Sequence, residues 1–305
     1  MSLSGNILAT LAYHDSLDRA LTSFEVWKYL IDDSGEGERS SLGETVTALS
    51  GRDLAGRIAE VDGFYTLCGR EELALRRIRS EKTATAKLHR IRRLAKALRI
   101  VPFVRMIGVT GSLAMRRGDA ESDWDLFVVI RTGRIFSGRT CLTGFLQAIG
   151  KRRHGARSKD RACLNYFVTE DGLEIPTEDL FSANEYSFLI PLFGRETFRR
   201  FELKNRWIAK RLPNRLPTEV LPLWSVPESC RLLSVRRFFE RVIDVDAAES
   251  WLRSWQRRKI MRNPNTAIEG GRIEATDRAL VFLPHPHGPS VYERFRRRLS
   301  EVRLR

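Results

Sequence analysis

Two aspartates that alternate along the chain, Asp123 and Asp125, stand at the start of an apolar run that ends at Ile130. The run is rich in β-branched and aromatic residues, which predicts a strand. Alternate residues of a strand point to the same face of a sheet, so we expect the two carboxylates side by side. Paired carboxylates can hold Mg²⁺ together with phosphate oxygens, and two such ions can stabilise both oxygens of an in-line displacement.

A Gly-Ser pair, Gly111 and Ser112, follows a second apolar run at 101–110. Glycine lets the backbone approach an anion closely, and the N–H groups of a short helix predicted at 113–117 would point toward that anion. The Ser112 hydroxyl can donate to a phosphate oxygen. The alternative is that the aspartates are surface acids and the Gly-Ser pair is a plain turn. A charge beside a buried strand is unusual, which favours the functional interpretation.

The segment from Gly111 to Val129 resembles the nucleotidyltransferase motif of the DNA polymerase beta superfamily. It is especially similar to the minimal and the aminoglycoside nucleotidyltransferases. The specific motif covers about 107–130, and the matching core would extend to about residue 176. The resemblance implies an α/β (α+β) core, a nucleoside triphosphate donor, Mg²⁺ as cofactor, and transfer of a nucleoside monophosphate to a hydroxyl acceptor.

The same resemblance implies roles for individual residues. Asp123 and Asp125 would hold magnesium and act in catalysis. Gly111 and Ser112 would seat the triphosphate. One of the two arginines that follow, Arg116 or Arg117, would assist the phosphates.

The family pattern includes a third acid on a following strand, and this sequence departs from it. The next predicted strand, 162–168, carries Asn165 at the expected position. Asparagine can accept a hydrogen bond or ligate a metal through its carbonyl, but it cannot act as a carboxylate base. Glu174 is the alternative acid, on a further strand predicted at 173–175. Slow catalysis, a substituted base, and a nucleotide-binding protein that has lost turnover all remain open.

The order of predicted elements divides the chain into four parts. They are a winged helix-turn-helix-like domain at 1–69, a basic connecting helix at 70–99, the nucleotidyltransferase core at 100–176, and a helical C-terminal region at 177–305. In the first part, Thr22-x-x-Glu25 and a second capping box at 41–44 each predict a helix start. The candidate recognition helix at 53–60 is nearly neutral, so a protein-contact role ranks above duplex DNA binding.

The formal net charge of +15 favours a polyanionic partner, which could be nucleic acid, a nucleotide or acidic lipid head groups. The basic helix at 70–99 has either a solvated charged face or a polyanion-binding surface. A generally arginine-rich composition without any such partner is the alternative. A protein acceptor for the nucleotide is open as well.

Two tryptophans in the C-terminal region, Trp251 and Trp255, lie among arginines and lysines. They are expected to belong to the core, with a base-stacking platform as the alternative. No apolar run is long enough to span a bilayer, and the N-terminus lacks a secretion signal. The four cysteines are scattered, without the spacing of a zinc site or a disulfide framework. These features predict a cytoplasmic protein without a membrane partner.

Overall fold

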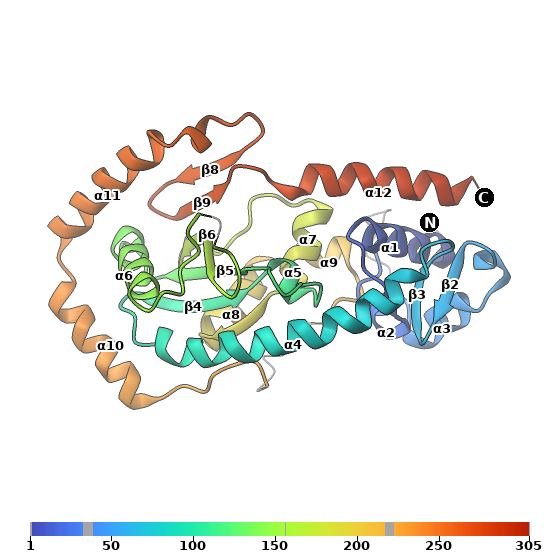
Figure 1. The fold of residues 1–305 in the computed structure, drawn as a ribbon, viewed down its shortest axis with the longest axis horizontal. Coiled ribbons are helices and arrows are strands. Elements are labelled where there is room, and N and C mark those ends of the chain that lie inside the picture. Colours follow the sequence, from blue (N-terminus) through green and yellow to red (C-terminus); the bar gives the residue numbers. More distant parts are fainter. Residues whose placement is uncertain (1, 33–38, 156, 217–222, 305) are drawn as a thin grey trace.

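A six-stranded mixed sheet forms the centre of the protein (Figure 1) in the computed structural model, which describes residues 2–32, 39–155, 157–216 and 223–304. Strands β5 and β6 are parallel, and every other neighbouring pair in the sheet is antiparallel. The mixed α/β class predicted from the sequence is confirmed. The strands in their order across the sheet are β7 (Ile190–Phe193), β4 (Val104–Val109), β5 (Trp124–Ile130), β6 (Ala162–Thr169), β9 (Ala279–Leu283) and β8 (Arg272–Ala275).

Both faces of the central strands are covered by helices. Helix α6 (Ile135–Ala148) connects β5 to β6 and packs closely on the sheet. Gly138 makes this close packing possible, since an added Cβ there would lie 2.5 Å from the Ile130 side chain. On the other face, the Phe127 ring contacts aromatic rings of α7 (Leu180–Ser187) and α8 (Arg195–Lys204). Burial on both faces explains why β5 is an almost continuous apolar run after its aspartate.

Within the described residues of the N-terminal part there are three α-helices and a three-stranded sheet of order β1-β3-β2. Both predicted capping boxes are confirmed, at Thr22–Glu25 and at Ser41–Glu44. The elements in chain order are α1 (Leu3–Ser16), β1 (Leu21–Thr22), α2 (Ser23–Lys28), α3 (Leu42–Leu49), the 3₁₀ turn η1 (Arg52–Leu54), β2 (Ile58–Val61) and β3 (Phe64–Leu67).

The helix predicted at 53–60 is wrong. Only the short turn η1 forms there, and β2 begins at Ile58. Gly56 adopts a left-handed φ of 73°, which breaks a helix, and the residues from Ile58 onward pair with β3. The helix that precedes the β2–β3 hairpin is therefore α3, which carries no basic residue and exposes Leu42 and Val46.

The predicted basic connecting helix is α4 (Glu72–Leu98), which runs from the N-terminal part along the central sheet (Figure 1). Two of its cations, Arg77 and Lys87, are buried. Arg90 forms an ion pair with Asp160 at 2.5 Å, and Arg92 donates to a backbone carbonyl. Several of its charges therefore hold the fold together, while Arg93 and Lys96 stay exposed.

The C-terminal region is helical only in part, which corrects the prediction for 177–305. Strands β7, β8 and β9 come from this region and supply half of the central sheet, which thus crosses the predicted boundary. These strands are short, and β8 and β9 pair as a hairpin. Arginines on both sides of the hairpin make its apolar pattern hard to recognise in the sequence. The remaining elements are α9 (Ile208–Arg211), α10 (Cys230–Ile243), α11 (Asp246–Met261), the turn η2 (Pro264–Ala267) and α12 (His287–Arg303).

Helix α12 packs along α1, so the two ends of the described chain lie near one another (Figure 1). Among the helices that the structure describes, none is both long enough and apolar enough to cross a membrane.

Candidate active site

The two aspartates lie together at the start of β5, as predicted. Asp125 is opposite Cys163 in the parallel register of β5 and β6. One ligand atom from each of Asp123, Asp125 and Cys163 lies within 4.8 Å of the other two, and all three residues are partly buried. This group could hold a metal ion.

Gly111 brings the Gly-Ser turn directly against Asp125. Strand β4 ends where the antiparallel β5 begins, and the Thr110 N–H donates to the Asp125 carbonyl at 3.0 Å. Gly111 has a φ of 68°, and an added Cβ would lie 2.5 Å from an Asp125 carboxylate oxygen. No other residue type fits this backbone and this contact. Ser112 follows in the first turn of the short helix α5 (Gly111–Ala114) and is partly exposed.

Glu185 is a site residue that the sequence analysis missed. It lies on α7, and its carboxylate accepts a hydrogen bond of 2.7 Å from the Gly111 N–H. Burial raises the pKa of Glu185 to about 7, against the lowering effect of that hydrogen bond, and the nearby Asp125 adds to the rise. The sequence offered only a weak signal, a lone acid within an otherwise uncharged helix.

Helix α4 holds both ends of the turn that separates Gly111 from Asp123. Arg77 donates to the Met115 carbonyl at 3.1 Å, and Ser80 donates to the Arg116 carbonyl at 2.9 Å. Lys87 donates to the Ser122 carbonyl at 2.5 Å, directly before Asp123. The buried cations of α4 therefore position the two halves of the site.

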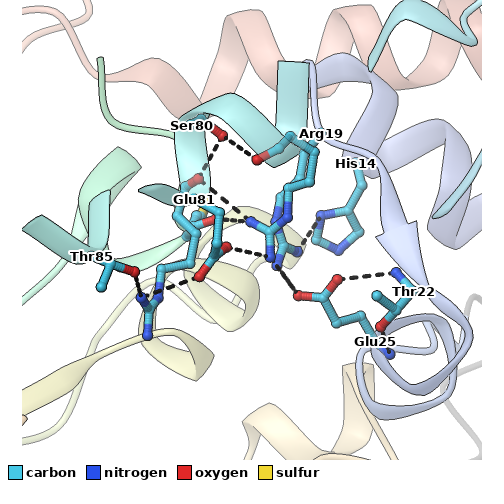
Figure 2. A network of polar contacts seen from close by, with 10 residues as sticks. His14, Arg19, Thr22, Glu25, Ser80, Glu81 and Thr85 are labelled. Atoms are coloured by element: carbon cyan, nitrogen blue, oxygen red, sulfur yellow. Dashed lines mark hydrogen bonds and ion pairs between the residues drawn. The ribbon is translucent and has the colours of Figure 1, made fainter. Parts of the chain in front are cut away.

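Figure 2 shows the network that extends from α4 to the N-terminal part. The carboxylate of Glu25 accepts from Arg19 at 2.5 Å and from Arg77 at 3.0 Å, so α2 and α4 share one partly buried acid. Arg77 also pairs with Glu81 at 3.1 Å. The network links the N-terminal part to the segment that follows the Gly-Ser turn.

Arg116, predicted to assist phosphates, belongs to this network instead. Its guanidinium contacts Thr85 at 3.2 Å and Glu81 at 3.3 Å, and it lies over the Trp224 ring. Arg116 has a left-handed φ of 60°, and with this backbone conformation its side chain reaches α4. The alternative, Arg117, interacts electrostatically with Glu185, which in turn contacts Gly111.

Arg153 is the second residue that the sequence analysis missed. It belongs to the basic segment between α6 and β6, and its guanidinium lies 2.6 Å from an Asp123 oxygen and 3.6 Å from the Cys163 sulfur. Burial raises the pKa of Asp125 to about 6, with a smaller contribution from Asp123, while Arg153 acts in the opposite direction. The two aspartates thus have a partly exposed cation, Arg153, next to them.

The third position holds an amide and a thiol. The Asn165 amide donates to an Asp125 carboxylate oxygen at 3.3 Å, so Asn165 lies beside the aspartates, as predicted. A bulge in β6 places Leu164 and Asn165 together opposite Leu126, so Cys163 and Asn165 both reach the aspartate face. Burial, together with the adjacent aspartates, raises the pKa of the Cys163 thiol to about 12, which keeps it protonated.

Glu174 does not fill the third position. It is exposed and lies in no strand, beyond the end of β6 at Thr169. Thr169 pairs with Ile130, at the far end of β5 from Asp125. The parallel register therefore takes Glu174 away from the aspartates, and the predicted alternative is wrong.

The two carboxylates and the thiol of this group suit different metal ions. Mg²⁺ takes oxygen ligands and is usually bound by one or two carboxylates, with phosphate oxygens and water completing its shell. Thiols prefer softer ions. Asp123 and Asp125 therefore offer oxygen ligands to a hard cation, and Cys163 offers a sulfur ligand to a softer one.

No protein-family model, curated protein or solved structure matches this chain. What the site can do chemically therefore follows from its own residues. The strongest of these are the aspartate pair and the glycine packed against it.

Proposed function

We propose that the protein is a magnesium-dependent nucleotidyltransferase, which moves a nucleoside monophosphate from a nucleoside triphosphate to a hydroxyl acceptor. The observation that carries the proposal is the contact between Gly111 and Asp125. A left-handed glycine, with no room for a Cβ, lies against one of two paired carboxylates. Such packing costs conformational freedom and places two acids together, which a purely structural turn does not need.

The residues would divide the work between the metal and the phosphates. Asp123 and Asp125 would hold magnesium, which supplies charge neutralisation for the phosphates when it is bound. Ser112 would donate its hydroxyl to a phosphate oxygen. Arg153 lies beside Asp123 with an exposed guanidinium, and it could turn from that carboxylate to a phosphate.

The third position favours a second candidate function, a nucleotide-binding regulator with weak or no turnover. The two side chains that reach Asp125 from β6 are an amide and a protonated thiol. Neither can accept a proton from an attacking hydroxyl at neutral pH. This candidate shares the metal and nucleotide site with the first and differs only in the chemical step.

Two measurements separate these functions. Calorimetry with a nucleoside triphosphate and Mg²⁺ tests the shared site, and Asp123→Asn and Asp125→Asn should each abolish binding. Release of pyrophosphate with candidate acceptors tests the transfer. Unchanged binding in both variants would exclude the site itself.

Asn165→Asp tests the third position. The substitution restores a carboxylate beside Asp125, and we expect it to raise pyrophosphate release about 100-fold, the usual contribution of a positioned base. Cys163→Asp, on the same face, is the companion variant. If parent protein binds nucleotide but neither variant turns it over, the regulator is the better description.

We also propose that the N-terminal part is a winged helix used for protein contacts. The helix before its hairpin, α3, exposes Leu42 and Val46 and has no cation for phosphates or bases. A cytoplasmic location, nucleic acid as a partner of the basic surfaces, and a protein as the acceptor stay predictions. Absence of duplex DNA binding at low salt, where phosphate contacts are strongest, is the expected result.

A further inference from the structure

The back of the sheet, opposite the aspartates, contains a pocket of about 580 Å³. It lies between α6, α11 and the β8–β9 hairpin, and its size is that of small-molecule sites. Leu164 of β6 lines it, while the next residue, Asn165, points to Asp125 on the other face. The pocket is therefore separated from the candidate active site by the sheet itself.

Three cations line this pocket, Arg139, Arg152 and Lys259. Among the described residues, no carboxylate forms an ion pair with any of them. Elsewhere the partly buried arginines Arg105, Arg134 and Arg215 each have an acidic partner. Cations that lie close together repel one another, and an anion bound among them would relieve that repulsion.

Arg139 is held in a fixed orientation. It donates to Gln256 at 2.6 Å, and its guanidinium lies over the Phe282 ring at 4.7 Å. Gln256 is buried and is fixed in turn by donating to the Phe136 carbonyl and to Thr140, each at 2.9 Å. Most of the donors of this preorganised guanidinium thus have no hydrogen-bond partner in the part of the chain that the structure describes.

The two arginines of the pocket repel one another. Burial lowers the pKa of Arg139 to about 10, and Arg152 adds to the effect. Arg139 nevertheless remains charged at neutral pH. A smaller adjoining pocket of about 260 Å³ shares Arg152 and adds Arg157 and Arg161. The positive potential thus continues from one pocket to the next.

The wall of the larger pocket on α11 is aromatic. Trp255 lines it, is 47% exposed, and lies parallel to Trp251 with ring centroids 6.1 Å apart. Lys259 lies over the Trp255 ring at 5.3 Å. A half-exposed indole beside cations suits a planar ring that carries a negative group. Asn263 and Asn265 add polar groups at the same wall.

We propose that this pocket binds a mononucleotide, with its phosphate at Arg139, Arg152 and Lys259 and its base at Trp255. The site is independent of the nucleotidyltransferase proposal, because it needs neither the aspartates nor a metal. It supplies the anion that the three cations lack and the planar ring that the exposed indole accommodates. One chain would then hold nucleotides on both faces of its sheet.

The test is calorimetry on the full chain in EDTA, which removes metal-dependent binding at the aspartates. The four ribonucleoside 5′-monophosphates are the probes, with inorganic phosphate and the free nucleosides as separate arms. At least one monophosphate should bind more tightly than phosphate or its own nucleoside. Arg139→Gln should weaken its affinity at least tenfold, as expected for lost charge-assisted hydrogen bonds.

Lys259→Gln is the second variant, and because Lys259 is exposed its substitution should leave the fold intact. Its matched control is Arg258→Gln, the neighbouring exposed cation on α11 that does not line the pocket. Lys259→Gln should weaken binding about fivefold or more, and Arg258→Gln should leave it unchanged. Equal losses in the two variants would overturn the proposal in favour of a general attraction of anions.

Two further variants distinguish the parts of the site. Trp255→Leu should weaken nucleotide binding and leave phosphate binding unchanged. Asp123→Asn should change neither, and a loss there would place the nucleotide on the aspartate face and overturn the proposal. Binding of oligonucleotides alone, without affinity for any mononucleotide, would also overturn it and indicate a nucleic-acid surface.

Discussion

On one face of the central sheet, Asp123 pairs with Arg153 and Asp125 accepts a hydrogen bond from Asn165. On the other face, Arg139 and Arg152 repel one another and have no acidic partner among the described residues. The first face is a set of acids partly neutralised by its own chain. The second is a set of cations that the chain leaves uncompensated.

The two faces differ in how each accommodates like charges that lie close together. Where acids are buried together, the pKa of Asp125 rises to about 6, so a proton competes with any metal. Where the cations are arginines, no proton can relieve the repulsion, because Arg139 keeps its charge at neutral pH. The aspartate face should therefore respond to pH and to substitution more strongly than the α6 face.

The largest expected effect comes from Gly111→Ala. The new Cβ would lie 2.5 Å from the Asp125 carboxylate, so the aspartate must move and metal–triphosphate binding should fall about 100-fold or more. The control is Gly133→Ala, which has a similar φ of 75° but nothing within 4 Å. Both variants should lose about 1–2 kcal/mol of stability from backbone strain. Equal nucleotide affinity in Gly111→Ala and Gly133→Ala would show that the close contact of Gly111 with Asp125 does not matter for binding.

Asp125→Asn should stabilise the metal-free protein at pH 7. The folded-state pKa of Asp125 is raised, so the folded protein holds this proton more tightly than the unfolded chain, and stability rises as pH falls from about 6 to 4. Asparagine supplies the neutral form at every pH, which should add about 1–3 kcal/mol in urea unfolding with EDTA. Asp62→Asn, an exposed control, should change stability little. A lower free energy of unfolding for Asp125→Asn would contradict the view that the ionised Asp125 carboxylate destabilises the folded protein.

Metal binding should weaken about tenfold between pH 7 and pH 5, because a proton on Asp125 excludes the cation. Glu185, with a pKa of about 7, titrates nearby and broadens the change. Calorimetry with Mg²⁺ or Mn²⁺ across this range measures it. On the α6 face, Arg139 stays charged throughout, so binding of non-titrating sulfate to the pocket should change much less. A flat profile for the metal would show that Asp125 is not a ligand.

The smallest effect is expected from Arg153→Gln. The guanidinium competes with a metal for Asp123, so its removal should raise affinity for the metal alone about two- to fivefold. Arg152→Gln is the matched control, one residue earlier and lining the pocket on the other face. It should leave metal affinity unchanged. Weaker metal binding in Arg153→Gln would mean that this arginine orients Asp123 for the metal.

Local patterns in the sequence determined the aspartate pair, the Gly-Ser turn, the two capping boxes and the long α4 helix. Each depends on residues a few positions apart, through strand alternation, backbone freedom or hydrogen bonds within one turn. The pairing of Gly111 with Asp125 follows from the same patterns once β4 and β5 are neighbours.

Only the tertiary structure decided which other residues meet these two. The register of β5 with β6 chose Cys163 and Asn165 over Glu174, and the packing of α7 brought Glu185 to Gly111. Strands β7, β8 and β9 escaped prediction because short strands gain their stability from partners far along the chain. The cationic pocket needs α6 and α11 together, and no local pattern records that two distant helices will leave their cations facing one cavity.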